Sequence, residues 1–255
     1  MWLRLRQVAL VAGRLAPVLE DLDAVFGLEP AFRDPGVATF GLENAVLPVG
    51  NQFLEVVAPV REGTTAGRYL ERRKGDGGYM VITQCDGHAP VKARVTDLGI
   101  RKVLEFDHAD YHCMQLHPAD TGGSFLEIDE QVGGEALDGP WEPAGRDWQR
   151  ARRTHVVDGI AAAEVQAAEP DKLAARWGEI VAIEVTADAA GHPTLVLANA
   201  VVRFVPAVDG RGDGLGGIDL RATDAGAAQA AAERRGLLAA DGTINLCGMR
   251  MRLVG

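Results

Sequence analysis

In the first 60 residues, short apolar runs flank a segment in which apolar residues recur every three to four positions. Residues 7–12 (QVALVA) form an apolar run that predicts a strand. Residues 15–26 place apolar side chains at helical spacing until Gly27 ends the pattern. Further strands, separated by turn residues, are predicted at residues 37–40, 45–49 and 53–57. The first 60 residues therefore predict one βαβββ unit.

The same order of elements returns along the chain. QFLEVV at 52–57 resembles SFLEID at 124–129, which places Glu55 and Glu127 72 residues apart. LENAVLPV at 42–49 resembles LANAVVRF at 197–204, which places Asn44 and Asn199 155 residues apart. A strand, a helix and three strands are predicted at residues 79–83, 88–98, 102–106, 111–117 and 124–129.

Residues 132–153 interrupt this order with glycines, prolines, charges and two tryptophans, Trp141 and Trp148. We interpret the segment as a linker packed between two halves. A third unit follows with a strand at 160–166, a helix at 170–178 and strands near 183–186, 194–197 and 201–206. A fourth has a strand at 217–222, a helix at 225–235 and strands within 243–254.

These patterns predict an α+β protein of four βαβββ units, paired into two cupped half-barrels with the helices on the outside. The predicted first half covers residues 1–131, with units at 1–60 and 75–131. The linker covers residues 132–153, and a second, degenerate half covers residues 154–255.

Charge and cysteine content narrow the classes of partner. The chain has 36 acidic and 26 basic residues, and a formal charge of −10 disfavours nucleic acid and anionic membrane. The densest basic run, RYLERRK at 68–74, is interpreted as a solvated turn or helix end. Three cysteines far apart in the sequence indicate reduced structural thiols, and we expect a cytoplasmic protein without membrane spans. Monomer and homodimer both remain open.

The closing segments NQFLEVVAP and HPADTGGSFLEID carry a resemblance to a known family. With the doubled βαβββ unit, the chain resembles the vicinal oxygen chelate superfamily of glyoxalases, bleomycin-resistance proteins, epimerases and extradiol dioxygenases, and glyoxalase-like domain proteins most of all. The motifs cover residues 3–130, whereas residues 155–255 match by repeat pattern only.

The resemblance implies a divalent metal ion bound by Gln7, Glu55 and Glu127, on the first and last strands of the units. Met80 stands where the family usually has a histidine, and a thioether is a poor ligand for a hard or borderline ion. Glu127 would also move protons in catalysis. The residues expected to face a small-molecule substrate are Tyr79, Met80, His112 and His117.

Other interpretations of these side chains remain open. Glu55 and Glu127 could be outward-facing strand carboxylates, and His117 could cap a turn before Pro118. His112 and His117 are five residues apart on one strand, so only one of them can join Glu127.

In the second half Ala162 and Gly217 occupy the opening positions, with Arg203 and either Arg250 or Arg252 near the closing ones. These residue types do not bind a divalent cation. The second half is interpreted as a structural mimic of the first, in preference to a cup that binds an anionic group through its arginines.

Three function classes follow from the sequence. The first is a metal-dependent lyase, isomerase or dioxygenase acting on a small organic substrate. The second is a metal-free small-molecule binding protein of the resistance type, and the third is a structural or regulatory protein. The presence or absence of bound metal separates the first class from the second.

Overall fold

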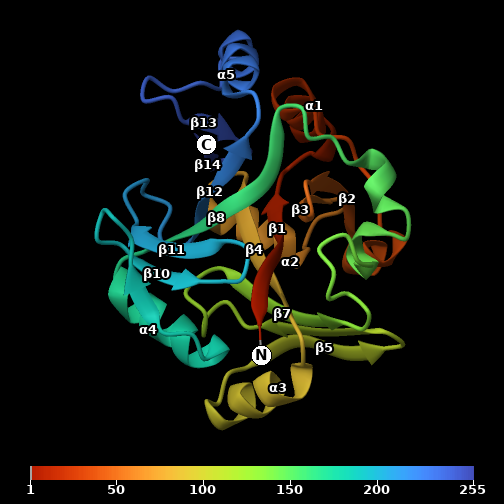
Figure 1. The fold of residues 1–255 in the computed structure, drawn as a ribbon, viewed down its shortest axis with the longest axis vertical. Coiled ribbons are helices and arrows are strands. Elements are labelled where there is room, and N and C mark those ends of the chain that lie inside the picture. The colour runs from red at the N-terminus through yellow and green to blue at the C-terminus, as the bar shows by residue number, and fades with distance from the viewer. Residues whose placement is uncertain (1) are drawn as a thin grey trace.

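Two mixed sheets form the molecule, one from each half of the sequence (Figure 1). The structure is a computed structural model that describes residues 2–255. Strand order in sheet 1 is β2-β3-β1-β4-β7-β6-β5, and in sheet 2 it is β13-β14-β12-β8-β11-β10-β9. In both sheets the first strands of two units, β1 and β4 or β8 and β12, lie antiparallel at the centre. Each closing strand pairs parallel with the first strand of its unit.

The first half contains seven strands and three α-helices among the described residues. Its elements in chain order are β1 (Leu3–Val11), α1 (Leu15–Phe26), the 3₁₀ helix η1 (Pro35–Phe40), β2 (Leu42–Val49), β3 (Gln52–Pro59), α2 (Thr65–Arg73), β4 (Gly77–Cys85), α3 (His88–Asp97), β5 (Lys102–His108), β6 (Tyr111–Leu116) and β7 (Phe125–Gln131).

The second half repeats this architecture with two α-helices. The connecting segment contains the 3₁₀ helices η2 (Glu142–Ala144) and η3 (Trp148–Ala151). The later elements are β8 (Val157–Ala167), α4 (Pro170–Val181), β9 (Val185–Ala187), β10 (Pro193–Val196), β11 (Val201–Pro206), β12 (Gly214–Ala222), α5 (Ala225–Arg234), β13 (Ile244–Leu246) and β14 (Met249–Val254). The predicted α+β fold of paired βαβββ-like units is confirmed.

Two local predictions were wrong, and a third was right in part. Residues 37–40 belong to η1 instead of a strand, because Asp34 accepts a hydrogen bond from the Gly36 N–H and Pro35 begins the helix. Residues 68–74 form the end of α2 with Lys74 as its cap, and most of them are exposed, but Arg73 is buried and bonds the 211–213 backbone. The similarity between residues 42–49 and 197–204 does not mark equivalent positions of two units, because Asn44 lies in β2 and Asn199 precedes β11.

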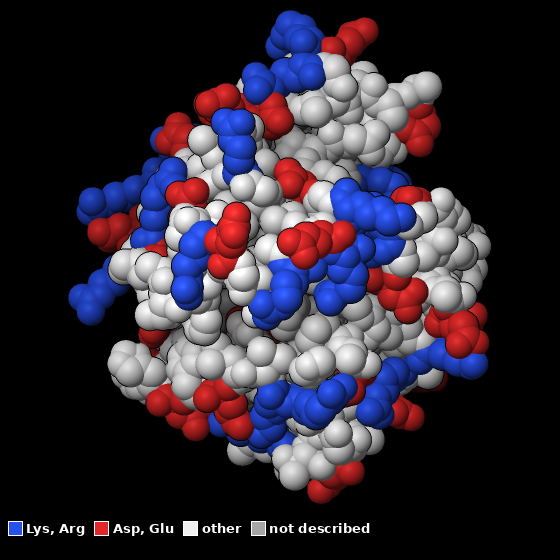
Figure 2. Space-filling view, turned by 180° about the vertical axis from the view of Figure 1, so that it is seen from behind, with Lys and Arg blue, Asp and Glu red and all other residues white. Residues whose placement is uncertain are grey.

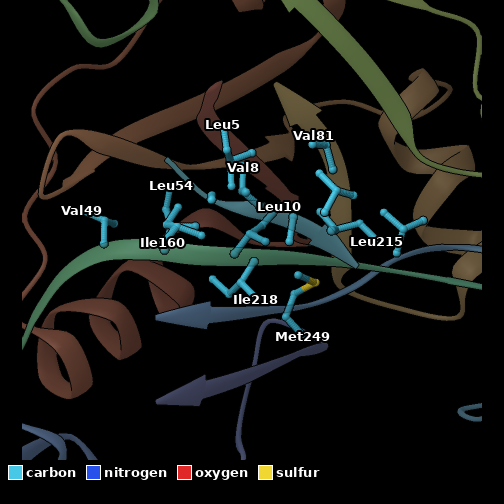
Figure 3. Close-up of a cluster of buried hydrophobic side chains, with 14 of the residues drawn as sticks. Leu5, Val8, Leu10, Val49, Leu54, Val81, Ile160, Leu215, Ile218 and Met249 are labelled. Carbon is cyan, nitrogen blue, oxygen red and sulfur yellow. The ribbon is translucent and has the colours of Figure 1, made fainter. Parts of the chain in front are cut away.

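Apolar side chains from both sheets form one core between them (Figure 3). Leu5, Val8 and Leu10 of β1 face Ile160 and Ile218 of sheet 2 across this layer. Helices complete the core at its two ends, where α1 contacts α5 and α3 contacts α4 (Figure 1). In residues 2–255 no helix has the length and apolar character needed to cross a membrane.

Two reciprocal amide contacts join the halves. Asn199 accepts from the Leu5 N–H at 2.9 Å and donates to the Leu5 carbonyl at 3.0 Å. Gln52 likewise accepts from the Ile160 N–H at 2.8 Å and donates to the Ile160 carbonyl at 2.9 Å. The register of β1 shifts next to Leu5, and that of β8 shifts next to Ile160. Each amide therefore bonds backbone groups beside a register shift in the other half.

Hairpin glycines allow the halves to approach closely. Gly50, between β2 and β3, has φ 61°, and a Cβ there would lie 1.8 Å from the Asp158 carbonyl oxygen. Gly248, between β13 and β14, has φ 64°, and a Cβ there would lie 1.9 Å from the Asp76 carbonyl oxygen. Both positions therefore exclude any side chain.

The segment 132–153 packs on the concave face of sheet 1. Trp141 and Trp148 are each 1% exposed. They pack with Phe53 and Met80 in an apolar cluster on this face, which we call the concave apolar cluster. The Arg6 guanidinium lies between the rings of Phe53, Trp141 and Trp148, at 5.1, 5.5 and 5.8 Å from their centroids. This segment, which we call the strap, covers part of that face.

Candidate functional site

The concave face of sheet 1 brings the three predicted metal ligands to neighbouring strands. Gln7 lies on β1, Glu55 on β3 and Glu127 on β7, and the pairings through Ala9 and Ile82 place all three on one face. Glu127 is 5% exposed, so it is not an outward-facing carboxylate. The sequence left the orientation of Glu127 open, and in the structure its side chain faces the concave side of sheet 1.

Gln7 and Glu55 belong to a closed hydrogen-bond network. The Glu55 carboxylate accepts from Gln7 Nε2 at 2.9 Å through one oxygen and from Asn44 Nδ2 at 2.7 Å through the other. Gln7 Oε1 in turn accepts from the Trp141 indole N–H at 2.9 Å. Burial raises the pKa of Glu55, while the bonds from Asn44 and Gln7 oppose the rise.

Glu127 belongs to a second group on the same face. One potential ligand atom from each of Cys113, Glu127 and Asp129 lies within 4.8 Å of the other two. Asp129 Oδ2 accepts from the Tyr111 hydroxyl at 2.6 Å, whereas Glu127 Oε2 has no hydrogen-bond partner among residues 2–255. A buried oxygen without a partner is costly unless something else binds it.

Burial dominates the protonation of this group. It raises the pKa of Glu127 well above its usual range, and the Asp129 charge adds to the rise. It raises the pKa of Asp129 to about 7, although the bond from Tyr111 opposes it. Burial also raises the pKa of the Cys113 thiol, so the three groups resist ionising together without a cation.

Tyr79 and Met80 lie in the wall of the concave apolar cluster. Tyr79 is 8% exposed and its ring packs edge-on against Tyr69 of α2 and Phe125 of β7, each with centroids 4.9 Å apart. Met80 is 7% exposed and pairs with Ala9 and Phe125 across the sheet. Both side chains are therefore packed within this cluster, and a substrate-binding role for them stays a prediction.

The two histidines are placed elsewhere. His112 neighbours Cys113 on β6 and therefore points to the opposite face, where its ring bonds the Asp107 carboxylate at 2.9 Å. His117 Nδ1 accepts from the Ala119 N–H at 3.1 Å, which is the turn-capping role considered from the sequence. Neither ring is brought to Glu127, and a substrate-binding role for them stays a prediction.

Sequence reasoning missed several residues of this face. Asp129 could have been found, because it lies two residues after Glu127 in a strand and so shares its face. Cys113 required the pairing of Gln115 with Glu127, which the sequence alone does not fix. Asn44 and Trp141 required the tertiary arrangement of β2 and the strap.

The corresponding face of sheet 2 contains an ion-pair cluster. Glu164, two residues along β8 from Ala162, accepts hydrogen bonds from Arg203, Arg250 and Arg252. Burial alone would raise the pKa of Glu164, but the bonds from Arg252 and Arg250 outweigh it and lower the pKa to about 2. The arginines predicted near the closing positions thus have carboxylate partners within the chain.

Charged side chains of both signs are interspersed on the molecular surface (Figure 2). The view from behind shows Lys and Arg next to Asp and Glu over much of that face. Such a surface has no extended field of one sign on the face shown.

The strand order and a full-length structural match decide the fold. A hypothetical protein from Staphylococcus aureus aligns over 100% of this chain and 99% of its own, with a TM-score of 0.67 and 12% sequence identity. The chain has the vicinal oxygen chelate fold.

Methylmalonyl-CoA epimerases align with half of the chain. The Streptomyces coelicolor enzyme in complex with 2-nitronate-propionyl-CoA covers 50% of this chain and 96% of its own, with a TM-score of 0.45 and 20% identity. The Mycobacterium tuberculosis epimerase covers 50% and 87%, with a TM-score of 0.44 and 20% identity. No protein-family model and no curated protein sequence matches the chain.

Proposed function

We propose that the chain acts on a small organic substrate at the concave face of sheet 1, as a lyase, isomerase or dioxygenase assisted by a divalent metal ion. The observation that carries this proposal is the buried Glu127 carboxylate, whose Oε2 lacks a partner and which lies beside Cys113 and Asp129. A buried carboxylate of this kind is stabilised by a cation.

The residues present offer two ligand sets that share Glu127. The set implied by the resemblance adds Gln7 and Glu55, but these two satisfy each other and Asn44 through hydrogen bonds. They therefore do not call for a cation in this arrangement. The group of Cys113, Glu127 and Asp129 contains the unsatisfied oxygen and fits a cation better.

A bound ion would polarise oxygens of the substrate and stabilise negative charge that develops on them. Within the chain, Glu127 would position the ion, and Tyr79 and Met80 would exclude water and contact apolar parts of the substrate. Glu127 remains our candidate for the residue that moves a proton.

The first test changes Glu127 to Gln. The amide loses the negative charge, so we expect Glu127→Gln to lose bound metal and any metal-dependent turnover, each by at least about tenfold. Metal is measured by elemental analysis of protein purified without a nickel column or chelator. Glu105→Gln on the exposed strand β5 is the control and should keep its metal. Full metal content in Glu127→Gln would contradict the proposal.

The closed network around Glu55 favours a second candidate, a metal-free small-molecule binding protein. In that case the ligand would enter between the first two units, with Met80 on the wall and Glu127 as the polar anchor. The soft, apolar side chain of Met80, in place of a metal-binding histidine, suits contact with a partly apolar molecule.

The second candidate is tested by screening small molecules for thermal stabilisation of the metal-free chain. We expect Met80→Arg to abolish the shift caused by any hit, because it fills the first cup with a charged side chain. Ala162→Arg, on the first strand of sheet 2, should leave the shift intact. The reverse pattern would place the functional cup in the second half.

A further inference from the structure

We propose that Cys113, Glu127 and Asp129 bind a borderline divalent ion such as Zn²⁺ through one thiolate and two carboxylates, without Gln7 or Glu55. The inference rests on the proposed metal-assisted function and names the ligands of that site. It differs from the ligand set implied by the resemblance at every residue except Glu127.

Strand pairing brings the three side chains together. β6 and β7 are antiparallel, with Gln115 opposite Glu127, so Cys113 and Asp129 lie on the same face one step along the ladder. Their ligand atoms are all within 4.8 Å of one another. Tetrahedral zinc with bonds of about 2.0–2.3 Å needs donor atoms on the order of 3.5 Å apart. Small side-chain rotations close that difference.

The unpartnered oxygen of Glu127 is a second and independent observation. Glu127 is 5% exposed, yet its Oε2 has no hydrogen-bond partner in residues 2–255. Cys113 and Asp129 are 2% and 0% exposed. The hydrogen bonds to Asp129 include those from two neutral donors, the Tyr111 hydroxyl at 2.6 Å and the Met114 N–H at 3.4 Å. A divalent cation would compensate the charge of the ionised group and bind the free oxygen.

The donor types select the ion. A thiolate favours Zn²⁺, Co²⁺ or Fe²⁺ over Mg²⁺ and Ca²⁺, which prefer oxygen ligands only. Three protein ligands leave a fourth position for water or substrate, as in catalytic zinc sites. The Tyr111 hydroxyl on Asp129 would orient that ligand from outside the site.

Cobalt substitution tests the thiolate directly. The full chain, freed of metal, is titrated with Co²⁺, and the near-ultraviolet thiolate-to-cobalt absorption band is recorded with the amount of bound metal. We expect the band in the unchanged chain and its loss in both Cys113→Ser and Cys113→Val, with affinity at least about tenfold weaker. Cys85→Ser is the matched control, because Cys85 is also buried but belongs to the core between the sheets.

The variants separate this inference from the proposed function. Asp129→Asn should weaken binding like the Cys113 variants, and Glu55→Gln should leave both band and stoichiometry unchanged. Circular dichroism of each variant establishes that it is folded. Stoichiometric cobalt without the band, or metal lost in Glu55→Gln but kept in Cys113→Val, would overturn the ligand assignment and leave a metal-assisted function standing. Absence of bound Co²⁺ and Zn²⁺ would overturn the ligand assignment, and absence of any bound divalent ion, Mg²⁺ and Mn²⁺ included, would overturn both.

Discussion

Glu164 shows how one residue changes the chemistry of a shared scaffold. It lies on the concave face of sheet 2 and is bonded by Arg203, Arg250 and Arg252, whose side chains are 16%, 23% and 39% exposed. In sheet 1 the buried acids Glu127 and Asp129 have no such cationic hydrogen-bond partners within residues 2–255. Equivalent faces of one fold thus favour an internal ion-pair cluster in one half and cation binding in the other.

Replacing Glu164 with Gln should destabilise the chain by about 3 kcal/mol at neutral pH, because it leaves partly buried arginines without their shared partner. The folded pKa near 2 lies below the usual 4.5, so this contribution is present above pH 4.5 and is lost as the pH falls toward 2. Urea unfolding at several pH values measures both effects. Glu179→Gln, on exposed α4 surface, should change stability by less than about 0.5 kcal/mol. Equal losses in the two variants would argue against the cluster.

Among the structural elements, the strap is the segment whose position could not be predicted from the spacing of apolar residues. The helix at 15–26 was predicted with its observed bounds, because its apolar spacing and Gly27 are local signals. The strap was predicted to pack between the two halves through its tryptophans, but Trp141 and Trp148 pack on the concave face of sheet 1. That position depends on contacts more than a hundred residues away in sequence. For the same reason the bond from Trp141 to Gln7 could not be predicted.

Trp141→Phe removes the indole donor to Gln7 while keeping an aromatic ring in the strap. We expect a loss of about 1–3 kcal/mol, because the buried Gln7 oxygen loses its partner. Chemical denaturation followed by circular dichroism measures the change. Trp2→Phe, at a partly exposed position, should be nearly neutral. If the two variants were equally stable, the Trp141–Gln7 bond would contribute nothing to strap docking.

Across the whole molecule, the halves behave as one packing unit. Their apolar faces share a core, and the Asn199 and Gln52 amides each bond both backbone groups of a residue in the other half. The division into residues 1–131 and 154–255 thus remains a proposal about sequence organisation, and it does not imply independent stability. The sequence revealed the repeat but not these contacts, which only the relative position of the sheets creates.

Asn199→Ala and Gln52→Ala should each cost about 2 kcal/mol, because each removes hydrogen bonds to buried backbone groups of the other half. Asn199→Ala leaves the Leu5 N–H without its side-chain acceptor, while the Leu5 carbonyl keeps its bond from Gln52 at 3.3 Å. Gln52→Ala removes the amide from both backbone groups of Ile160. Unfolding of the unchanged chain should be a single transition when followed by both tryptophan fluorescence and far-ultraviolet circular dichroism. Asn245→Ala, at an exposed position on β13, is the control. Two separate transitions in the unchanged chain would show that the halves unfold independently.

The hairpin glycines limit which positions of the two halves can change in sequence. Gly50 and Gly248 each place a turn of one half against a backbone carbonyl of the other, where even a methyl group does not fit. Substitutions there would push the sheets apart, whereas substitutions on the concave faces are absorbed within one half. Natural variants of this chain should therefore keep both glycines while the cups change residue by residue. A laboratory library with fixed glycines and varied cup residues would sample new ligand specificities on an unchanged frame.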